Sequence, residues 1–191
     1  MPTKLFTELP EEKRTRIEKA ALEEFAANRF DSASTNTIVK NSNISKGSLF
    51  KYFENKEDLY FYLIDTAAAK MAQETAAKVK ELPSDVFERI KAYSELEISY
   101  YLAHPSEGKL MTNFAAERDN EIAEKIAARY GDSSRNMYEQ LIEGTGLSRQ
   151  KSDILRWVLE GFNKEFLESG GDGKAYMESL DEYIEILRKV L

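Results

Sequence analysis

Apolar residues recur every three or four positions along most of this chain, which is the spacing of one face of an α-helix. The pattern starts in residues 10–28, where Ile17, Ala21 and Phe25 are in step and two glutamates follow Pro10, as the first turn of a helix favours. Sustained alternation with a period of two, the signal of a strand, is rare. The sequence therefore predicts an all-α fold of about nine helices.

Two short helical patterns lie between residues 34 and 53. Ser34 or Thr35 can cap the first and Ser45 the second, because serine and threonine are favoured at helix N-termini. Asn43 falls where the first must stop, and asparagine tolerates the left-handed conformation that such a stop requires. Two short helices joined by a turn of about four residues have the dimensions of a helix-turn-helix. Their N-termini, at Thr35 and Ser45, would also attract an anion such as phosphate.

Longer amphipathic patterns follow to the end of the chain. One begins with Asn55 and runs to about Val79, which is on the order of 36 Å of helix, more than the first three helices need. Other helices are expected over residues 84–104 with Ser84 as the cap, over 106–118 and 120–144, from Ser148, and over 176–191. We therefore expect two domains, a three-helix head over residues 1–54 and a helical body over residues 55–191.

Composition narrows the class of protein. Of 191 residues, 42% are apolar and 32% are charged, the mean hydropathy is -0.54, and no apolar run approaches the length of a membrane helix. The first residues lack the apolar core of a secretory signal, so we expect no membrane partner and a reducing, cytoplasmic location. The absence of cysteine and the single histidine, His104, exclude thiolate metal sites, cysteine nucleophiles and sites that need two imidazoles. Because no glycine-rich phosphate loop is present either, we expect no cofactor and no enzymatic activity.

The charge is unevenly distributed. The net charge of -7, from 27 basic and 34 acidic residues, argues against a general nucleic-acid binder. Residues 1–60 hold ten of each sign, so the whole excess of acid lies downstream. Residues 40–56 are locally basic, with four lysines against one glutamate: Lys40, Lys46, Lys51, Lys56 and Glu54. A solvated helix face is the commoner meaning of such a cluster, but this one coincides with the predicted helix-turn-helix.

The second helix of this motif carries side chains suited to a DNA groove. In a helix-turn-helix, the second helix enters the major groove with its N-terminus first. Lys46 and Lys51 would bring positive charge to phosphates or base acceptors. Gly47 would let the backbone approach closely, and Ser48 and Tyr52 would offer hydroxyls. The pattern therefore predicts a DNA-binding head.

Residues 30–59 form one recognisable run. Its most specific part is Ser45-Lys46-Gly47, Leu49-Phe50, Tyr52-Phe53 and Asn55-Lys56-Glu57-Asp58-Leu59. The run resembles the signature of the TetR/AcrR family of transcriptional regulators. The resemblance implies operator contacts at eight residues, with Lys56 on a phosphate: Thr35, Ser45, Lys46, Gly47, Ser48, Lys51, Tyr52 and Lys56. That family usually has tyrosine where Phe50 stands, so a phosphate contact from that hydroxyl is absent here.

The body holds the candidates for effector binding and dimerisation. Its large side chains are expected mostly in the core, with a few lining a ligand pocket: Met71, Tyr100, Tyr101, Phe114, Met137, Trp157 and Phe162. The helix after Ser148 and the last helix are expected to form a four-helix dimer interface through Val158, Gly161, Tyr176, Leu180, Tyr183, Ile184 and Leu187. Carboxylates could bind a cation or serve acid–base catalysis, but solvated helix faces explain nearly all of those considered: Glu95, Glu97, Glu117 and Glu121.

These observations predict a transcriptional regulator, most simply a repressor that binds a palindromic operator in double-stranded DNA as a homodimer. A small, largely apolar or aromatic effector would release it by moving the long helix that starts at Asn55. One alternative is a helical small-molecule carrier or enzyme whose head is merely structural. Another is an adaptor whose basic patch, residues 40–56, binds an acidic protein. Sequence-specific DNA binding would separate the first hypothesis from the other two.

Overall fold

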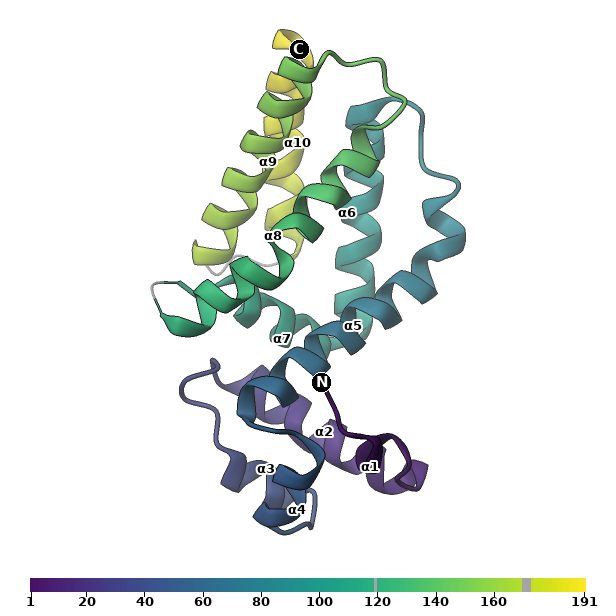
Figure 1. Ribbon diagram of the computed structural model, residues 1–191. Coiled ribbons are helices and arrows are strands. Elements are labelled where there is room, and N and C mark those ends of the chain that lie inside the picture. Colours follow the sequence, from purple (N-terminus) through teal and green to yellow (C-terminus); the bar gives the residue numbers. More distant parts are fainter. Residues whose placement is uncertain (119, 170–172) are drawn as a thin grey trace. The chain divides into compact units, whose positions relative to one another are not determined.

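The computed structural model describes residues 1–118, 120–169 and 173–191, leaving aside the side chains of residues 132–138, 160 and 163–169. Every regular element in these ranges is an α-helix, which confirms the all-α prediction (Figure 1). The helices are α1 (Lys4–Thr7), α2 (Glu11–Ala27), α3 (Thr35–Asn41), α4 (Lys46–Tyr52), α5 (Lys56–Val79), α6 (Val86–Ala103), α7 (Pro105–Ala115), α8 (Glu121–Ile142), α9 (Arg149–Ser169) and α10 (Gly173–Val190). Within the described ranges, no helix combines the length and the apolar character needed to cross a bilayer.

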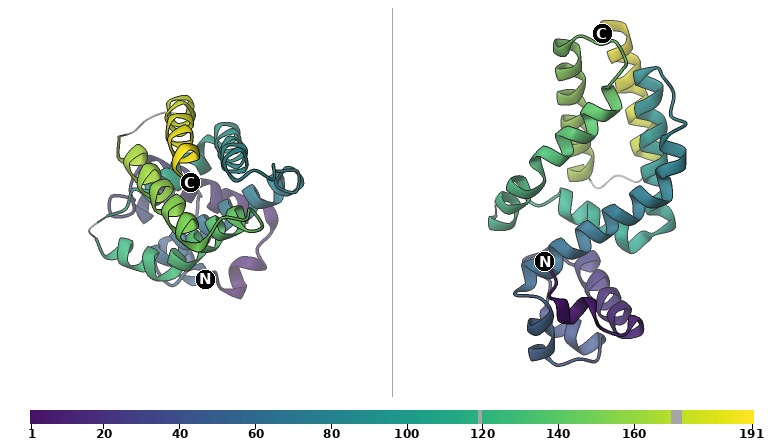
Figure 2. Two further views of the ribbon diagram at one scale, coloured as in Figure 1. Left: turned by 90° about the horizontal axis from the view of Figure 1, so that it is seen from above. Right: turned by 45° about the vertical axis from the view of Figure 1, so that its right-hand side comes forward.

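The chain divides into two compact units. The first unit comprises Met1–Glu74 and Tyr101–Phe114, and the second comprises Thr75–Tyr100 and Ala115–Leu191. Helices α5 and α6 each have residues in both units, so the chain passes between them without a break in either helix. Figure 2 shows the helices of each unit from two further directions. On α5 the change of unit falls between Glu74 and Thr75, and the domain boundary predicted after residue 54 stays a prediction.

Side-chain caps set the starts of several helices where the sequence predicts them. Ser34, Ser45 and Asn55 each accept a hydrogen bond from the backbone N–H three residues later, at 3.4, 3.0 and 2.8 Å. The start of α6 differs from the prediction, because the Asp85 carboxylate rather than the Ser84 hydroxyl accepts the first backbone N–H groups, two at 3.1 Å. Aspartate satisfies two of the four free N–H groups of that terminus and also complements the helix dipole.

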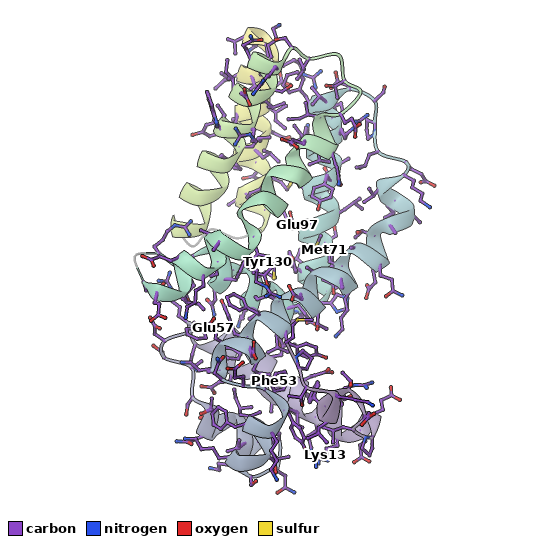
Figure 3. The ribbon with its side chains drawn as sticks, viewed as in Figure 1. Lys13, Phe53, Glu57, Met71, Glu97 and Tyr130 are labelled. Atoms are coloured by element: carbon purple, nitrogen blue, oxygen red, sulfur yellow. The ribbon has the colours of Figure 1, made fainter. Side chains whose placement is uncertain are left out.

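Aromatic rings fill the core of the first unit. Phe6 of α1 is fully buried, with its ring centre 4.7 Å from that of Phe53 and 5.5 Å from that of Tyr62. The ring of Tyr60 lies 5.0 Å from that of Phe25 in the same unit. Phe53 is labelled in Figure 3. The short helix α1 is not among the predicted helices, because four residues are too few to show a helical period.

The core of the second unit is built by α6, α9 and α10. Its buried members are Val86, Phe87, Ile90, Leu155, Leu159, Phe162, Leu180, Ile184 and Leu187. Phe162 was expected in a ligand pocket, and Leu180, Ile184 and Leu187 at a dimer interface. In the structure these four residues pack inside their own chain, and their predicted roles stay predictions. Helices α9 and α10 carry apolar residues on more than one face, and periodicity alone does not tell which face turns inward.

Charged pairs flank the contact between α6 and α10 in this unit. Lys91 Nζ lies 2.8 Å from the Asp181 carboxylate, and Arg188 lies 2.5 Å from the Glu88 carboxylate. The hydrogen bond with Asp181 raises the pKa of Lys91. These pairs are partly exposed, so they contribute little to stability compared with the apolar core between the helices.

Replacing Ile184 by alanine is expected to lower the free energy of unfolding by about 2–5 kcal/mol, because it leaves a cavity in a closed apolar core. Ile184 is fully buried in the contact of α10 with α6 and α9. Urea unfolding followed by circular dichroism measures the change. Lys189→Ala, an exposed substitution on the same helix, serves as the control and should shift stability by no more than about 0.5 kcal/mol. Equal effects of the two substitutions would contradict this description of the core.

Candidate nucleic-acid interface

Helices α3 and α4 form a helix-turn-helix in the first unit (Figure 1). The turn between them contains Asn43 with φ of 52°, which confirms the left-handed conformation predicted there. The backbone N–H of Ile44 reaches back to the Val39 carbonyl at 3.1 Å and closes the C-terminus of α3. From α2, Arg16 Nε donates to the Ser42 carbonyl at 2.9 Å. The turn is therefore held both by its own backbone and by the preceding helix.

Helix α4 has a buried side and a solvent side. Leu49 is buried in the core of the first unit, whereas Lys46 and Lys51 are exposed. Ser45 Oγ and Ser48 Oγ lie 2.9 Å apart at the N-terminus of α4, so two hydroxyls meet beside its free N–H groups. This end of the helix presents positive charge, hydroxyls and backbone donors together, which is the combination that phosphates and base edges bind.

Packing within the described part of the chain does not require a glycine at position 47. A Cβ at this position would meet only one atom, Ser45 Oγ at 3.9 Å, so the fold leaves room for a side chain. Glycine inside a helix is less favourable than alanine by about 1 kcal/mol. Because Ser45 Oγ is the only described atom near that position, Gly47 leaves room for a partner to approach α4 closely.

Tyr52, by contrast, belongs to the core. Its side chain is 8% exposed, its ring centre lies 5.9 Å from that of Phe6, and Lys13 Nζ lies 5.7 Å from the same ring. Thr3 adds a hydrogen bond from its backbone N–H to the Tyr52 carbonyl at 2.9 Å. Tyr52 therefore has a structural role, in which it fixes the C-terminal end of α4, and the DNA contact expected from its hydroxyl stays a prediction. The segment before α2 supplies part of that support through Thr3.

Lys56 is also turned inward rather than toward a phosphate. Its Nζ donates to the carbonyl oxygens of Phe30, Asp31 and Ala33 at 2.7, 3.4 and 3.2 Å, and it lies 4.4 Å from the centre of the Phe30 ring. An ammonium group has three N–H donors, and these three carbonyls use them all. The Lys56 ammonium therefore closes the loop between α2 and α3, and its phosphate contact stays a prediction.

Replacing Lys56 by methionine is expected to lower the free energy of unfolding by about 1–3 kcal/mol, because three loop carbonyls lose a charged donor. The dependence of DNA affinity on salt should stay as in the wild type, because no phosphate contact is lost. Thermal unfolding and DNA titrations over a range of salt concentrations measure the two effects. A salt slope lowered by about 0.9 for each contact would instead assign Lys56 to a phosphate.

Two further residues of the motif complete the surface. Thr35, the first residue of α3, is half-buried beside the Ser34 cap. Phe50 on α4 is 40% exposed although it is a large apolar residue, and sequence reasoning noted only its missing hydroxyl. An exposed ring on a recognition helix suits apolar contact with a thymine methyl group. On α4 and at its cap, the exposed residues are therefore Ser45, Lys46, Gly47, Phe50 and Lys51, with Ser48 half-buried among them.

Comparison with known proteins agrees with this geometry. Residues 17–63, which run from α2 into α5, match the family model described as bacterial regulatory proteins, tetR family. The HTH-type transcriptional repressor SCO4008 of Streptomyces coelicolor is 25% identical over 175 residues, covering 85% of this chain and 87% of that protein. A TetR family transcriptional regulator from Chloroflexus aurantiacus superposes with a TM-score of 0.62 at 27% identity, covering 99% of this chain and 97% of the other. The head of the chain is therefore similar to that of TetR-family regulators.

A solved structure with a lower sequence identity shares the fold of most of the chain. The fatty acid degradation regulator FadR from Bacillus halodurans superposes with a TM-score of 0.64 at 19% identity, covering 89% of this chain and 96% of that one. Members of the TetR family are transcriptional regulators rather than enzymes, so this chain is a transcriptional regulator. The family model ends at residue 63, and the body of the regulator is recognised by its fold.

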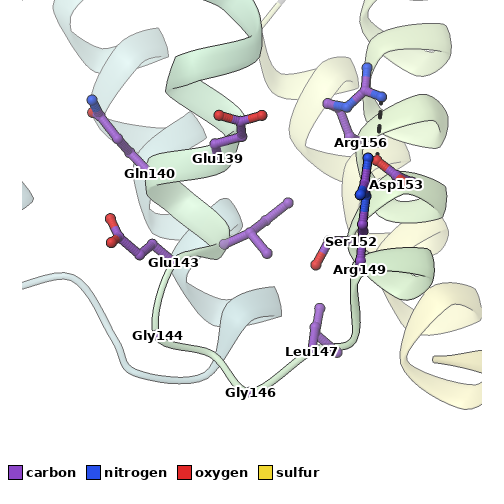
Figure 4. A pocket seen from close by; sticks show the side chains of 11 residues that line it. Glu139, Gln140, Glu143, Gly144, Gly146, Leu147, Arg149, Ser152, Asp153 and Arg156 are labelled. Carbon is purple, nitrogen blue, oxygen red and sulfur yellow. Dashed lines mark ion pairs between the residues drawn. The ribbon is translucent and has the colours of Figure 1, made fainter.

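The expected pocket residues are divided between the two units in the described structure. Met71, Tyr101 and Phe114 are half-buried in the first unit, Tyr100 is buried in the second, and Met137 lies outside the described side chains. Trp157 is 59% exposed, so it does not line an interior pocket. An open hollow of about 790 Å³ lies elsewhere, at the loop between α8 and α9, and is lined mostly by polar residues (Figure 4). There Arg156 pairs with Asp153 at 3.6 Å.

Proposed function

We propose that this TetR-family protein is a repressor that binds a palindromic operator as a dimer and leaves it when a small effector binds. The observation that carries the proposal is the solvent side of α4, where Lys46 and Lys51 flank a glycine that the fold does not require. The similarity to a protein named as an HTH-type transcriptional repressor supports repression as the outcome of binding.

An exposed apolar face on α9 and α10 supports dimerisation. The two helices lie side by side in the second unit (Figures 1 and 2). Their exposed large apolar residues are Ile154 and Trp157 on α9, and Tyr183, Ile186 and Val190 on α10. On each helix these residues are three or four positions apart, so they form a stripe opposite the core. Clustered apolar residues at the surface mark an interaction site.

Gly161 extends the stripe of α9 by one further turn. It is exposed, and nothing lies within 4 Å of the position where its Cβ would be. As at Gly47, packing within the described part of the chain does not require glycine here. Close packing of a helix from a second subunit would favour it. Two copies of this face related by a two-fold axis form a four-helix interface. The same axis relates the two DNA-binding heads, so each head can bind one half-site of a palindrome. Of the residues predicted for this interface, Gly161 and Tyr183 are exposed, and Val158 and Tyr176 are half-buried.

The effector is proposed to act through α5. This helix begins directly after the helix-turn-helix, and its last residues belong to the second unit. An effector that binds one arrangement of the body better than another shifts the population of that arrangement, and a continuous helix transmits the change to the head. We propose that the effector binds among the helices of the second unit. Together with α5, these helices belong to the helical body over residues 55–191 that was predicted to bind the effector and to dimerise.

A gel shift with DNA from the protein's own upstream region, at stated salt concentrations, tests the central proposal. We expect a discrete complex that scrambled DNA does not compete away, with two protomers for each operator. A protein that binds no DNA in this assay, or that binds scrambled DNA equally well, would contradict the proposed repressor. Titration of effector candidates against the complex then tests release separately from binding.

A further inference from the structure

Phe50 is a large apolar side chain on the solvent side of α4, the second helix of the helix-turn-helix. It is 40% exposed, whereas Leu49 and Tyr52 of the same helix and Phe53 at its end are buried. Among the described residues, no ring contact joins Phe50 to another aromatic side chain, although the rings of Tyr52 and Phe53 both pack against Phe6. The exposed part of the Phe50 ring is therefore available to a partner outside the chain.

The neighbouring positions on α4 leave this ring open. With about 3.6 residues per turn, the four exposed positions follow one another around the helix axis in the order Lys46, Phe50, Gly47 and Lys51. A helical side chain leans toward the N-terminus and covers the turn before its own Cα, which for Phe50 is the turn that contains Gly47. Because position 47 has room for a side chain but has none, no side chain there separates the ring from a partner.

The charges around the ring match the major groove of DNA. Lys46 and Lys51 are exposed on the two sides of Phe50 and Gly47, so positive charge borders an apolar centre. In the major groove, phosphates likewise border the base edges on both sides. Thymine is the one base of unmodified DNA that presents an apolar group there, its C5-methyl. An apolar ring between two lysines is therefore complementary to a thymine between two phosphate backbones.

We propose that Phe50 is a specificity-determining residue whose ring contacts the C5-methyl group of a thymine in each half-site of the operator. The proposal rests on the proposed function, because it names a base that the DNA-binding helix selects.

The chemistry of the side chain favours base recognition over backbone positioning. Phenylalanine has no hydroxyl group, so Phe50 makes no hydrogen bond to a phosphate, and phosphate contacts carry no direct information on sequence. Cytosine in place of thymine would turn an amino group toward the ring, and adenine or guanine would turn polar atoms toward it. Each replacement loses the apolar contact, so the ring distinguishes thymine from the other three bases.

Removal of the thymine methyl groups from the DNA tests the contact without knowledge of the operator sequence. The protein's own upstream region is copied with deoxyuridine in place of thymidine, which removes the C5-methyl groups and keeps every base-pairing edge. In a gel shift, the full-length protein should bind the uracil fragment about tenfold more weakly than the thymine fragment. One buried methyl group contributes about fourfold in affinity, and a dimer makes the contact in two half-sites. Equal affinities for the two fragments would overturn the proposal.

Two variants assign the preference to Phe50. Phe50→Ala should bind the thymine and uracil fragments within about twofold of each other, because the ring that contacts the methyl groups is gone. Leu5→Ala removes another exposed apolar side chain of the same unit, 58% exposed on α1, and should keep the wild-type preference. A Phe50→Ala variant that keeps the full preference for thymine would assign the methyl contact to another residue and overturn the proposal, whatever its melting temperature.

Selection of binding sites from random-sequence DNA locates the base. The wild type should enrich thymine at a position in each half-site, and Phe50→Ala should lose that enrichment while the rest of the selected site stays the same. A specific complex that is insensitive to thymine methyl groups would overturn this inference alone. The absence of any specific complex with DNA would overturn the proposed function together with it, so the two failures are distinguishable.

Discussion

Trp157→Glu combined with Ile186→Glu is expected to convert the dimer into a monomer and to lower operator affinity by about 100-fold or more. The two residues are 59% and 60% exposed on neighbouring helices, so the substitutions leave the core of the subunit intact. A two-fold axis places each substitution in the interface twice, and four carboxylates would then have to be buried without partners. One head alone makes half of the phosphate contacts, which accounts for the loss of affinity.

Sedimentation velocity at micromolar concentration measures the change in mass, and a gel shift measures the change in affinity. Leu102→Glu is the matched control, because Leu102 is 73% exposed and apolar but does not belong to the stripes on α9 and α10. The control should remain a dimer and bind DNA as the wild type does. A wild-type protein that sediments as a monomer, or a double variant that stays dimeric, would show that this face is not the interface.

Local signals in the sequence predict most helix starts and the helix-turn-helix. Ser34, Ser45 and Asn55 cap the helices that they were expected to cap, because a cap needs only the few residues around it. Asn43 adopts the left-handed conformation for the same local reason. Local signals do not predict the short helix α1, because its stability comes from the burial of Phe6 among rings that are distant in sequence.

The sequence does not predict whether a given side chain points into the protein or toward solvent. Lys56 and Lys51 look alike in the basic patch, yet the ammonium of Lys56 donates to loop carbonyls whereas Lys51 is exposed. Leu180 and Ile186 are both apolar residues of the last helix, and only the packing of α6 against α10 decides that Leu180 is the buried one. Each distinction depends on contacts between segments that are far apart in the chain.

Lys46→Ala combined with Lys51→Ala is expected to weaken operator binding on the order of 100-fold at low salt, because each dimer loses positive charge in both of its half-sites. Both ammonium groups are on the solvent side of α4, and Leu49, which holds that helix in the core, is untouched. The melting temperature should therefore stay close to that of the wild type. Stability and DNA affinity would then be affected by different lysines of the same basic patch.

The salt dependence of binding tests this division. The slope of the logarithm of affinity against the logarithm of salt concentration should become shallower by about 0.9 for each phosphate contact removed. Lys56→Met should keep the wild-type slope while it lowers stability, because the Lys56 ammonium is bound to backbone carbonyls. Lys40→Ala, at an exposed position on α3, controls for the general effect of removing one positive charge from the patch. An unchanged slope in the Lys46 and Lys51 double variant would mean that the exposed end of α4 does not face the sugar–phosphate backbone, and the repressor proposal would then lose the observation that carries it.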